Sequence, residues 1–389
     1  MNRTSYGGIY VHIPFCVNKC NYCDFLSYGN RAFLNGKFGT RYEVVALYVD
    51  TLIREINLTN SDEQFDTIYI GGGTPSSIEE EYIGQIIKAI QSQFDFVSDT
   101  EITIECNPKT VTEESAKMYK QYGINRVSIG LQSTNDYELK KLGRIHNYED
   151  FLQCYKYVKE AGIENVSVDL MSAIPEQTVE SYRENLQKIM ELNPAHISSY
   201  SLIIEEGTPF YDMDKRGLLN LVSEDEEREM YYLTNRILAE NGYERYEISN
   251  YSKPGFESRH NIKYWTGCSY LGFGLGASSM YKNTRYKNLD DLRKYVSMNN
   301  LCDIREDKIV LSEKDMMEEF MYLGLRIMDG VSKEDFFRRF NTSLEKIYSS
   351  QIDMLKTQNL VEEKGDMLRL TSKGIDVSNR VMSEFLLDI

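Results

Sequence analysis

Three cysteines lie close together near the start of the chain, in the run Tyr10-Val-His-Ile-Pro-Phe-Cys-Val-Asn-Lys-Cys-Asn-Tyr-Cys-Asp-Phe25. The spacing C-x3-C-x2-C of Cys16, Cys20 and Cys23 puts three thiolates on one short loop after an apolar, strand-like segment. Iron–sulfur clusters are held by cysteines at short, fixed spacings of this kind. A four-iron cluster with three cysteine ligands leaves one iron open to a small molecule, so the run predicts a cluster with a chemical role.

Zinc and disulfides explain these cysteines less well. Structural zinc sites use four protein ligands, usually as two separated pairs, and here Cys106, Cys154, Cys268 and Cys302 stand singly. Disulfide frameworks are typical of short secreted chains with an even number of cysteines, whereas this chain has 389 residues and 7 cysteines. The cluster is therefore the prediction that we carry forward.

Short β-rich runs alternate with amphipathic segments over the first two hundred residues. The predicted strands are residues 8–13, 66–70, 101–105, 126–130, 165–170 and 196–201. The predicted helices between them are residues 43–58, 78–94, 112–122, 148–161 and 179–192. Such alternation indicates βαβ units and a parallel sheet. Because βαβ crossovers share one hand, six units predict an α/β fold in the form of an open (β/α)6 partial TIM barrel.

Residues suited to chemistry follow these strands. The cysteine loop follows the first strand and Gly71-Gly-Gly-Thr-Pro75 follows the second, while Glu105, Gln132 and Asp169 end or follow the next three. In α/β barrels the chemistry collects at the C-terminal ends of the strands. We therefore expect these five segments to meet at one rim.

The sequence pattern changes after the first two hundred residues. Residues 206–305 are less regular and contain aromatic and glycine clusters. From residue 306 onward, helical patterns precede a hairpin at residues 360–371, with Gly365-Asp as its tight turn. We expect three parts: a barrel at 1–205, a region completing it at 206–305, and a smaller C-terminal α+β, winged-helix-like domain at 306–389.

Composition and charge argue against some classes of function. The apolar fraction of 41% is enough for a large core. The net charge of −16 argues against a nucleic-acid partner, which usually requires a basic face. No apolar run approaches the length of a membrane span, and the N-terminus lacks an apolar signal core. We expect a cytoplasmic protein.

Each polar candidate has a structural alternative. The glycine loop can bring its backbone close to a ligand, or it can be a strand-ending turn; without Gly-Lys-Ser/Thr it is not a Walker loop. Glu105 suits a ribose diol or an amino group, or it faces solvent. Arg144 could clamp a carboxylate through its fork, or form a surface salt bridge. Asp169 ends an apolar run, where a buried charge needs a partner or ligand.

The segment His260-Asn-Ile-Lys-Tyr-Trp265 contains the only tryptophan and one of four histidines. Histidine is a common axial ligand of heme iron, and aromatic side chains can pack on a porphyrin face. A structural histidine in an aromatic cluster is the alternative, and composition alone favours it.

Over nearly its whole length the chain resembles the oxygen-independent coproporphyrinogen III oxidase family of the radical S-adenosylmethionine (SAM) superfamily. Besides the cysteine motif, the similar runs are His12-Ile-Pro-Phe-Cys16, Gly71-Gly-Gly-Thr-Pro-Ser76, Arg126-Val-Ser-Ile-Gly-Leu-Gln-Ser133, Leu142-Gly-Arg-Ile-His146, Glu205-Glu-Gly-Thr-Pro-Phe210 and Lys253-Pro-Gly-Phe-Glu-Ser-Arg-His-Asn261.

Three features resemble the HemW branch, regarded as heme chaperones, rather than the HemN branch of true oxidases. Phe25 stands where the oxidase has a further cysteine, and only 15 residues precede Cys16, where the oxidase has a substantial extension. The HemW pattern His-Asn-x-x-Tyr-Trp is intact at residues 260–265. One stretch departs from the family: Asp169-Leu-Met-Ser-Ala-Ile-Pro175 replaces the usual Asp-Leu-Ile-Tyr-Gly-Leu-Pro, which we expect to alter the pocket near Asp169.

The resemblance implies specific roles. It makes Cys16, Cys20 and Cys23 the cluster ligands and His260 the heme ligand. The residues that it places around SAM are Tyr10, Tyr22, Gly72, Gly73, Thr74, Glu105, Gln132, Arg144 and Asp169. In this superfamily the open iron takes the amino and carboxylate groups of SAM, and an electron from the reduced cluster cleaves the sulfonium to give a 5′-deoxyadenosyl radical.

The resemblance thus implies a heme chaperone that binds heme and delivers it to apo-hemoproteins. It would carry a SAM-bound 4Fe-4S cluster and require an electron donor, and residues 206–305 would hold the heme-associated part. The cluster would gate heme release or drive homodimerisation rather than turn over a substrate. The alternative is a true oxidase in porphyrin biosynthesis, with Arg144 or another cation holding a propionate. A radical SAM enzyme acting on RNA is disfavoured by the charge.

Overall fold

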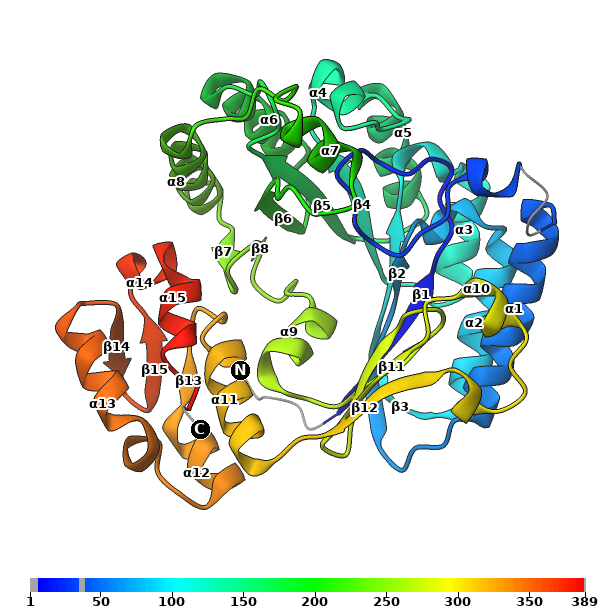
Figure 1. The fold of residues 1–389 in the computed structure, drawn as a ribbon. Helices are drawn as coiled ribbons and strands as arrows, with labels where there is room; N and C mark the ends of the chain where they lie inside the picture. Colours follow the sequence, from blue (N-terminus) through cyan, green and yellow to red (C-terminus); the bar gives the residue numbers. More distant parts are fainter. Residues whose placement is uncertain (1–5, 35–38, 388–389) are drawn as a thin grey trace.

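A parallel six-stranded sheet, curved into part of a barrel, forms the centre of the protein (Figure 1). The computed structural model describes residues 6–34 and 39–387. The six strands are β1 (Gly7–Ile13), β2 (Gln64–Gly72), β3 (Asp95–Cys106), β4 (Arg126–Gln132), β5 (Asn165–Ser172) and β6 (His196–Ser201). Each strand pairs in parallel with the next one along the chain.

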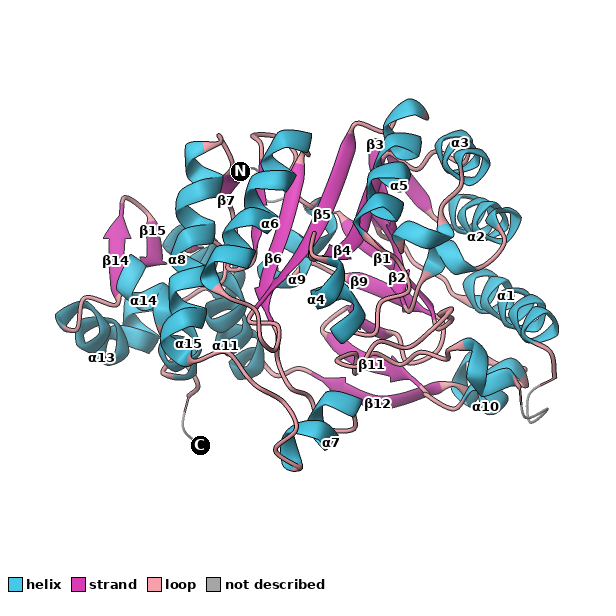
Figure 2. Ribbon diagram, turned by 90° about the horizontal axis from the view of Figure 1, so that it is seen from above, coloured by secondary structure: helices cyan, strands magenta, loops and turns pink. Residues whose placement is uncertain are grey.

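Amphipathic helices connect these strands and cover the outer face of the sheet (Figure 2). They are α1 (Arg41–Leu58), α2 (Glu80–Gln93), α3 (Glu113–Gln121), α5 (Tyr148–Glu160) and α6 (Val179–Leu192). In α6, Tyr182, Leu186 and Ile189 recur at helical spacing and are buried, and Thr178 caps the first turn. The predicted open (β/α)6 barrel is confirmed, with element ends shifted by a few residues. The short helix α4 (Asp136–Lys141) was not predicted.

The sheet continues past both edges of the barrel. On one side β9 (Tyr270–Phe273) pairs in parallel with β1, and β10 (Ser278–Tyr281), β11 (Thr284–Asn288) and β12 (Arg305–Val310) follow as antiparallel strands. On the other side β8 (Asn250–Ser252) and β7 (Glu244–Arg245) extend from β6. Strand β1, which leads into the cysteine loop, is therefore an interior strand.

Helix α9 (Arg259–Thr266) contains most of the His-Asn-x-x-Tyr-Trp segment and packs where strands β1 and β2 begin. Three barrel side chains anchor it. Glu101 accepts the backbone N–H groups of the first two helical residues, at 3.2 and 3.1 Å. Asp66 forms a buried ion pair with Lys263 at 2.5 Å, and Thr67 Oγ1 hydrogen-bonds His260 Nδ1 at 2.8 Å. The helix is thus fixed at the end of the barrel opposite the cysteine loop.

A smaller C-terminal unit has its own core. It contains α11 (Glu313–Gly324), α12 (Lys333–Phe340), α13 (Leu344–Thr357), α14 (Ser372–Asp376), α15 (Ser378–Ser383) and a sheet of β13 (Val331–Ser332), β14 (Val361–Lys364) and β15 (Met367–Leu370). Phe320, Phe336 and Tyr348 lie at the centre of this core. The predicted hairpin is present, and Gly365 in its turn has φ +62°.

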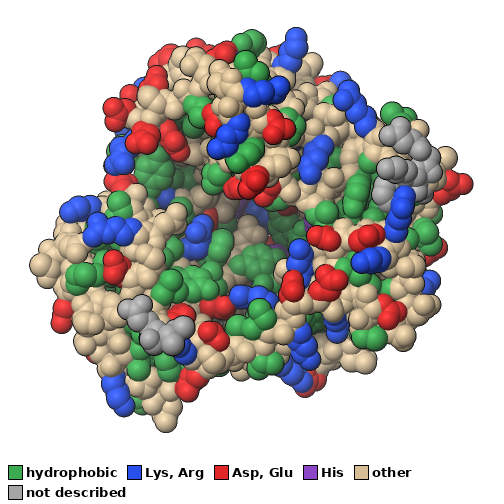
Figure 3. Space-filling model, in the orientation of Figure 1, with side chains coloured by type: hydrophobic (Ala, Val, Ile, Leu, Met, Phe, Trp, Pro, Cys, Tyr) green, Lys and Arg blue, Asp and Glu red, His purple; other side chains and the backbone are tan. Residues whose placement is uncertain are grey.

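The C-terminal unit lies at the end of the molecule away from α1 (Figure 2). Figure 3 shows the molecule hollowed between this unit and the barrel, with basic and acidic side chains around the rim. The expected boundaries at 205/206 and 305/306 stay predictions. Within the described residues, no helix has the length and apolar composition that crossing a membrane requires.

Candidate functional site

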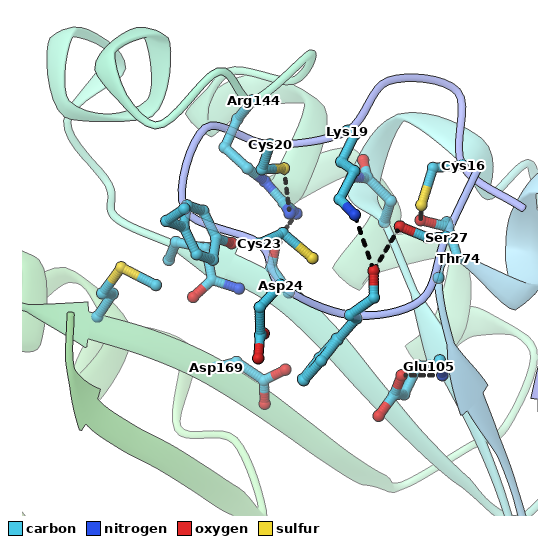
Figure 4. A pocket seen from close by; sticks show the side chains of 18 of the residues that line it. Cys16, Lys19, Cys20, Cys23, Asp24, Ser27, Thr74, Glu105, Arg144 and Asp169 are labelled. Atoms are coloured by element: carbon cyan, nitrogen blue, oxygen red, sulfur yellow. Dashed lines mark hydrogen bonds between the residues drawn. The ribbon is translucent and has the colours of Figure 1, made fainter. Parts of the chain in front are cut away.

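The cysteine loop and the C-terminal ends of the barrel strands line one cavity of about 420 Å³ (Figure 4). It brings together eleven of the thirteen residues singled out in the sequence. They are Cys16, Cys20, Tyr22, Cys23, Gly72, Gly73, Thr74, Glu105, Gln132, Arg144 and Asp169. Tyr10 and His260 lie outside this lining.

The three thiols are supported by their neighbours. Cys16 is buried, Cys20 and Cys23 are half-buried, and none of the three forms a disulfide. Thr74 Oγ1 lies 3.5 Å from Cys16 Sγ, and Arg144 Nη1 lies 3.6 Å from Cys20 Sγ. Burial raises the pKa of the Cys23 thiol to about 11. A bound cation is therefore needed to hold this side chain as a thiolate at neutral pH.

The donor set suits a cluster better than a single ion. Among the described residues, no three His, Cys, Asp or Glu side chains converge on one metal position. In a four-iron cluster each cysteine binds a different iron, so the three thiolates need to surround a volume rather than a point. The three cysteines line the same cavity, and Arg144 beside Cys20 can offset the negative charge of a thiolate-bound cluster.

Packing explains why two of the three consecutive glycines, Gly72 and Gly73, carry no side chain. A Cβ on Gly72 would lie 2.5 Å from His12 Nδ1, and φ is +109° there. A Cβ on Gly73 would lie 2.9 Å from the Phe15 carbonyl oxygen. The N–H groups of Gly73 and Thr74 donate to the carbonyls of Ile13 and Phe15, which ties this loop to the base of the cysteine loop. Because those donors are committed, the loop can offer carbonyl oxygens to a ligand, and these suit an ammonium group.

Two half-buried carboxylates, Glu105 at the end of β3 and Asp169 on β5, face the cavity from either side of β4 (Figure 4). Glu105 accepts hydrogen bonds from Tyr69 Oη at 2.7 Å and from the Gly72 N–H at 3.1 Å. Asp169 accepts from Ser128 Oγ at 3.0 Å. Burial raises the pKa of Glu105 to about 7 and that of Asp169 to about 6, although these hydrogen bonds oppose the shift. A cationic ligand between the two groups would stabilise their charged forms.

Gln132 is held in an unusual conformation. Its φ of 74° lies in the left-handed region, which a residue with a side chain adopts at a cost. Tyr200 Oη donates to Gln132 Oε1 at 2.8 Å, and this bond fixes the direction of the amide. Tyr200 also lines the cavity and was missed in the sequence. It stands one residue before the end of β6, so the strand-end rule that selected Asp169 could have found it.

Tyr10 lies outside the lining of the cavity and contacts it only through other residues. Its hydroxyl hydrogen-bonds His12 Nδ1 at 2.9 Å, and His12 Nε2 bonds the Leu26 carbonyl in the cysteine loop at 2.8 Å. Its ring stacks on Tyr69, with centroids 6.3 Å apart. The structure thus places Tyr10 behind the cysteine loop, which it supports through His12.

His260 lies at the other end of the barrel, and its side chain is 1% exposed. Nδ1 is hydrogen-bonded to Thr67, and Nε2 to Tyr264 Oη at 2.9 Å. The ring also stacks on Tyr69, with centroids 5.1 Å apart. As a heme ligand His260 stays a prediction, and ligation of iron would require at least one of these two hydrogen bonds to break.

Comparison with known proteins identifies the relatives of this chain. Residues 10–189 match the Radical SAM superfamily, and residues 311–377 match the HemN C-terminal domain. A protein of Lactococcus lactis subsp. lactis named Heme chaperone HemW is 40% identical over 97% of both chains. The chain belongs to the HemW family of radical SAM proteins. HemW proteins of Bacillus subtilis and Escherichia coli are 35% and 30% identical over 97% of this chain and 98% and 97% of theirs.

A solved structure shows the same fold. The coproporphyrinogen III oxidase HemN of Escherichia coli, described as a radical SAM enzyme, superposes with a TM-score of 0.83 over 99% of this chain and 91% of that chain. The two sequences are 21% identical, so the likeness is one of fold. Membership of the radical SAM superfamily implies a 4Fe-4S cluster and SAM as cofactors. The three thiols around the cavity and its two half-buried carboxylates fit that pair of groups.

Proposed function

We propose that this chain is a heme chaperone, which binds heme and passes it to apo-hemoproteins while carrying a SAM-bound 4Fe-4S cluster. The observation that carries the proposal is the 40% identity, over 97% of both chains, to a protein named Heme chaperone HemW. The His260–Trp265 pattern and Phe25 in place of a fourth nearby cysteine support the same branch.

In this proposal the cysteine loop holds the cluster through Cys16, Cys20 and Cys23. Arg144 lies beside Cys20 and also donates to the Gly130 carbonyl, so its guanidinium is oriented before any ligand binds. Because the guanidinium is already fixed, it can stabilise the negative charge of the thiolates without a free-energy cost of reorientation. The cluster, when bound, supplies an open iron for SAM and an electron for its cleavage.

The remaining cavity residues position SAM. The Gly72–Thr74 loop offers carbonyl oxygens to its ammonium group, and Glu105 and Asp169 offer negative charge to its cationic centre and hydroxyls. Tyr22 provides an aromatic face beside Tyr200 and Leu202, and Gln132 a directed amide. The proposal also includes a cytoplasmic location, an electron donor, and a cluster that gates heme release or drives homodimerisation.

The test uses the full chain with its cluster reconstituted under anaerobic conditions. Hemin titration followed by the Soret absorbance measures uptake, and mixing with an apo-hemoprotein measures transfer. Coproporphyrinogen III with SAM and a reductant is supplied in a parallel reaction as the control for oxidase activity.

We expect stoichiometric heme uptake, transfer to the acceptor, and no conversion of coproporphyrinogen III. A product carrying two vinyl groups would instead identify a decarboxylating oxidase. A protein with intact cluster and SAM binding that takes up no heme would also contradict the proposal.

A further inference from the structure

Helix α9 separates two spaces. His260 and Tyr264 point into the barrel, where they contact Thr67, Tyr69 and Tyr270. Ile262 and Thr266, on another side of the same helix, line a cleft between the barrel and the C-terminal unit. The side of α9 that faces this cleft is therefore not the side that carries the buried histidine.

The cleft is large enough for a cofactor. Its volume is about 950 Å³, more than twice the 420 Å³ of the cavity at the cysteine loop. Cofactor pockets span about 300–1,000 Å³, and this cleft differs from most of them in having ten charged side chains in its lining. Apolar groups come from both parts of the molecule: Tyr246 and Ile262 from the barrel side, and Ile327, Met328 and Met367 from the C-terminal side. Two such walls suit a flat, apolar ligand.

The charge of the cleft differs from that of the chain. Six basic side chains line it, namely Arg245, Arg259, Lys263, Arg338, Lys364 and Arg369, against four acidic ones, namely Glu244, Glu257, Asp329 and Asp335. The chain as a whole has 60 acidic and 44 basic residues. Arg338 and Lys364 are exposed at the ends of C-terminal elements. Four of the six cations already form ion pairs, among them Arg338 with Asp335 in the same cleft. A ligand with carboxylate arms would contact Lys364 and compete with Asp335 for Arg338.

Sulfur donors complete the lining. Cys268, Met328 and Met367 all face the cleft, and both cysteine and methionine side chains ligate heme iron in proteins. We propose that heme binds in this cleft, with its macrocycle between Ile262 and Met367, its propionates toward Arg338 and Lys364, and its iron on a sulfur donor of this set. The inference rests on the proposed function, because it assigns a place to the heme of that proposal.

The test compares charge-reversed variants by hemin titration of the full chain with its cluster in place. Arg338→Glu and Lys364→Glu change exposed cations of the cleft, and Lys373→Glu changes an exposed lysine of α14 outside it. Loss of one charge-assisted contact weakens binding by about tenfold. We therefore expect each cleft variant to raise the Kd for heme by about tenfold, and Lys373→Glu to leave it unchanged.

The absorbance spectrum of the bound heme tests which sulfur atom binds the iron. We expect one variant among Cys268→Ser, Met328→Leu and Met367→Leu to shift the Soret band, while the cluster absorbance is unchanged in all three. His260→Asn tests the competing site, because a shifted Soret band in this variant alone would place the iron on the barrel side of α9.

The outcomes separate this inference from the proposed function. If the wild-type protein takes up no heme, both the proposed function and heme binding in the cleft are contradicted. If Arg338→Glu and Lys364→Glu bind heme with wild-type affinity, heme does not bind in the cleft. The same holds if all three sulfur variants keep the wild-type Soret band. In both cases the proposed chaperone function is unaffected. Loss of heme in a folded His260→Asn variant alone would place heme on the barrel side of α9.

Discussion

At the scale of single residues, Ala173 occupies a position that favours glycine. Its φ of 58° lies in the left-handed region, and its side chain is buried. The family pattern has glycine at this position, so the departure noted in the sequence has a backbone cost. An alanine in this conformation loses about 1 kcal/mol relative to a residue without a Cβ.

We therefore expect Ala173→Gly to raise the free energy of unfolding by about 1 kcal/mol, measured from the urea midpoint. Ala161→Gly is the matched control, because Ala161 has an ordinary helical φ of −71° and glycine should lower stability there. Equal effects of the two substitutions would contradict the assignment of strain to Ala173.

Tyr69 connects the two ends of the barrel interior. Its ring stacks on His260, and its hydroxyl donates to Glu105, which in turn accepts from the Gly72 N–H. The hydrogen bond from Tyr69 partly offsets the burial that raises the pKa of Glu105 to about 7. Since the carboxylate is charged only above its pKa, attraction for a cationic ligand is present at high pH and lost as the pH falls.

Tyr69→Phe should raise the pKa of Glu105 further and weaken SAM binding by about tenfold at pH 7, with a smaller loss at pH 9. Calorimetric titration of SAM into the reconstituted protein between pH 6 and 9 measures this. Tyr137→Phe removes a similar bond, to Glu176 at 2.8 Å on the surface, and should leave the profile unaltered. A purely structural role for Tyr69 would lower affinity without shifting its pH dependence.

At the scale of elements, α9 is held by charges that its sequence pattern does not reveal. Lys263 and Asp66 are 3% and 2% exposed and form an ion pair at 2.5 Å. Removing one partner of a buried pair leaves the other charge in an apolar environment, at a cost of about 3–5 kcal/mol. Replacing both partners by neutral side chains costs much less.

Lys263→Met should therefore lower the melting temperature strongly, and the double variant Asp66→Asn/Lys263→Met should recover most of the loss. Thermal unfolding of the two proteins measures the difference. Should the double variant be no more stable than the single one, the anchoring of α9 would depend on packing rather than on this pair.

Some of these elements could be predicted from the sequence, and others could not. The six barrel strands and their helices were found because strand ends and amphipathic spacing are local signals, and that rule brought Glu105, Gln132 and Asp169 to one rim. Strands β7 to β12 have two to six residues and gain stability from partners far along the chain, as β9 does from β1. The burial of His260 depends on Thr67 and Tyr69 of another strand, which a single segment does not show.

At the scale of the whole molecule, Glu55 joins the first helix to the extension of the sheet. It lies on α1, is fully buried, and accepts hydrogen bonds from Tyr295 Oη at 2.6 Å, the Gly274 N–H at 2.9 Å and Asn288 Nδ2 at 2.6 Å. In the sequence it belongs to an amphipathic helix, where a glutamate is expected on the surface. Burial raises its pKa from 4.5 to about 7.

Because the folded state holds this proton more tightly than the unfolded chain, its contribution to stability is complete below pH 4.5 and is lost as the pH rises to about 7. The loss amounts to about 3 kcal/mol. Melting curves from pH 5 to 8 should show this slope in the wild type and a flatter one in Glu55→Gln. Glu229→Gln, at an exposed position of α8 (Glu224–Glu240), should keep the wild-type slope.

The place of β1 between β2 and β9 has a consequence for biosynthesis. The partner β2 begins at Gln64, but β9 begins only at Tyr270. At translation rates of about 5–20 residues per second, roughly ten seconds to a minute separates the emergence of β1 from that of β9. During this interval the strand that leads into the cysteine loop has one open edge, and apolar open edges promote association with other chains. Until β9 pairs with β1, a nascent chain of this protein therefore exposes the edge next to its cluster loop.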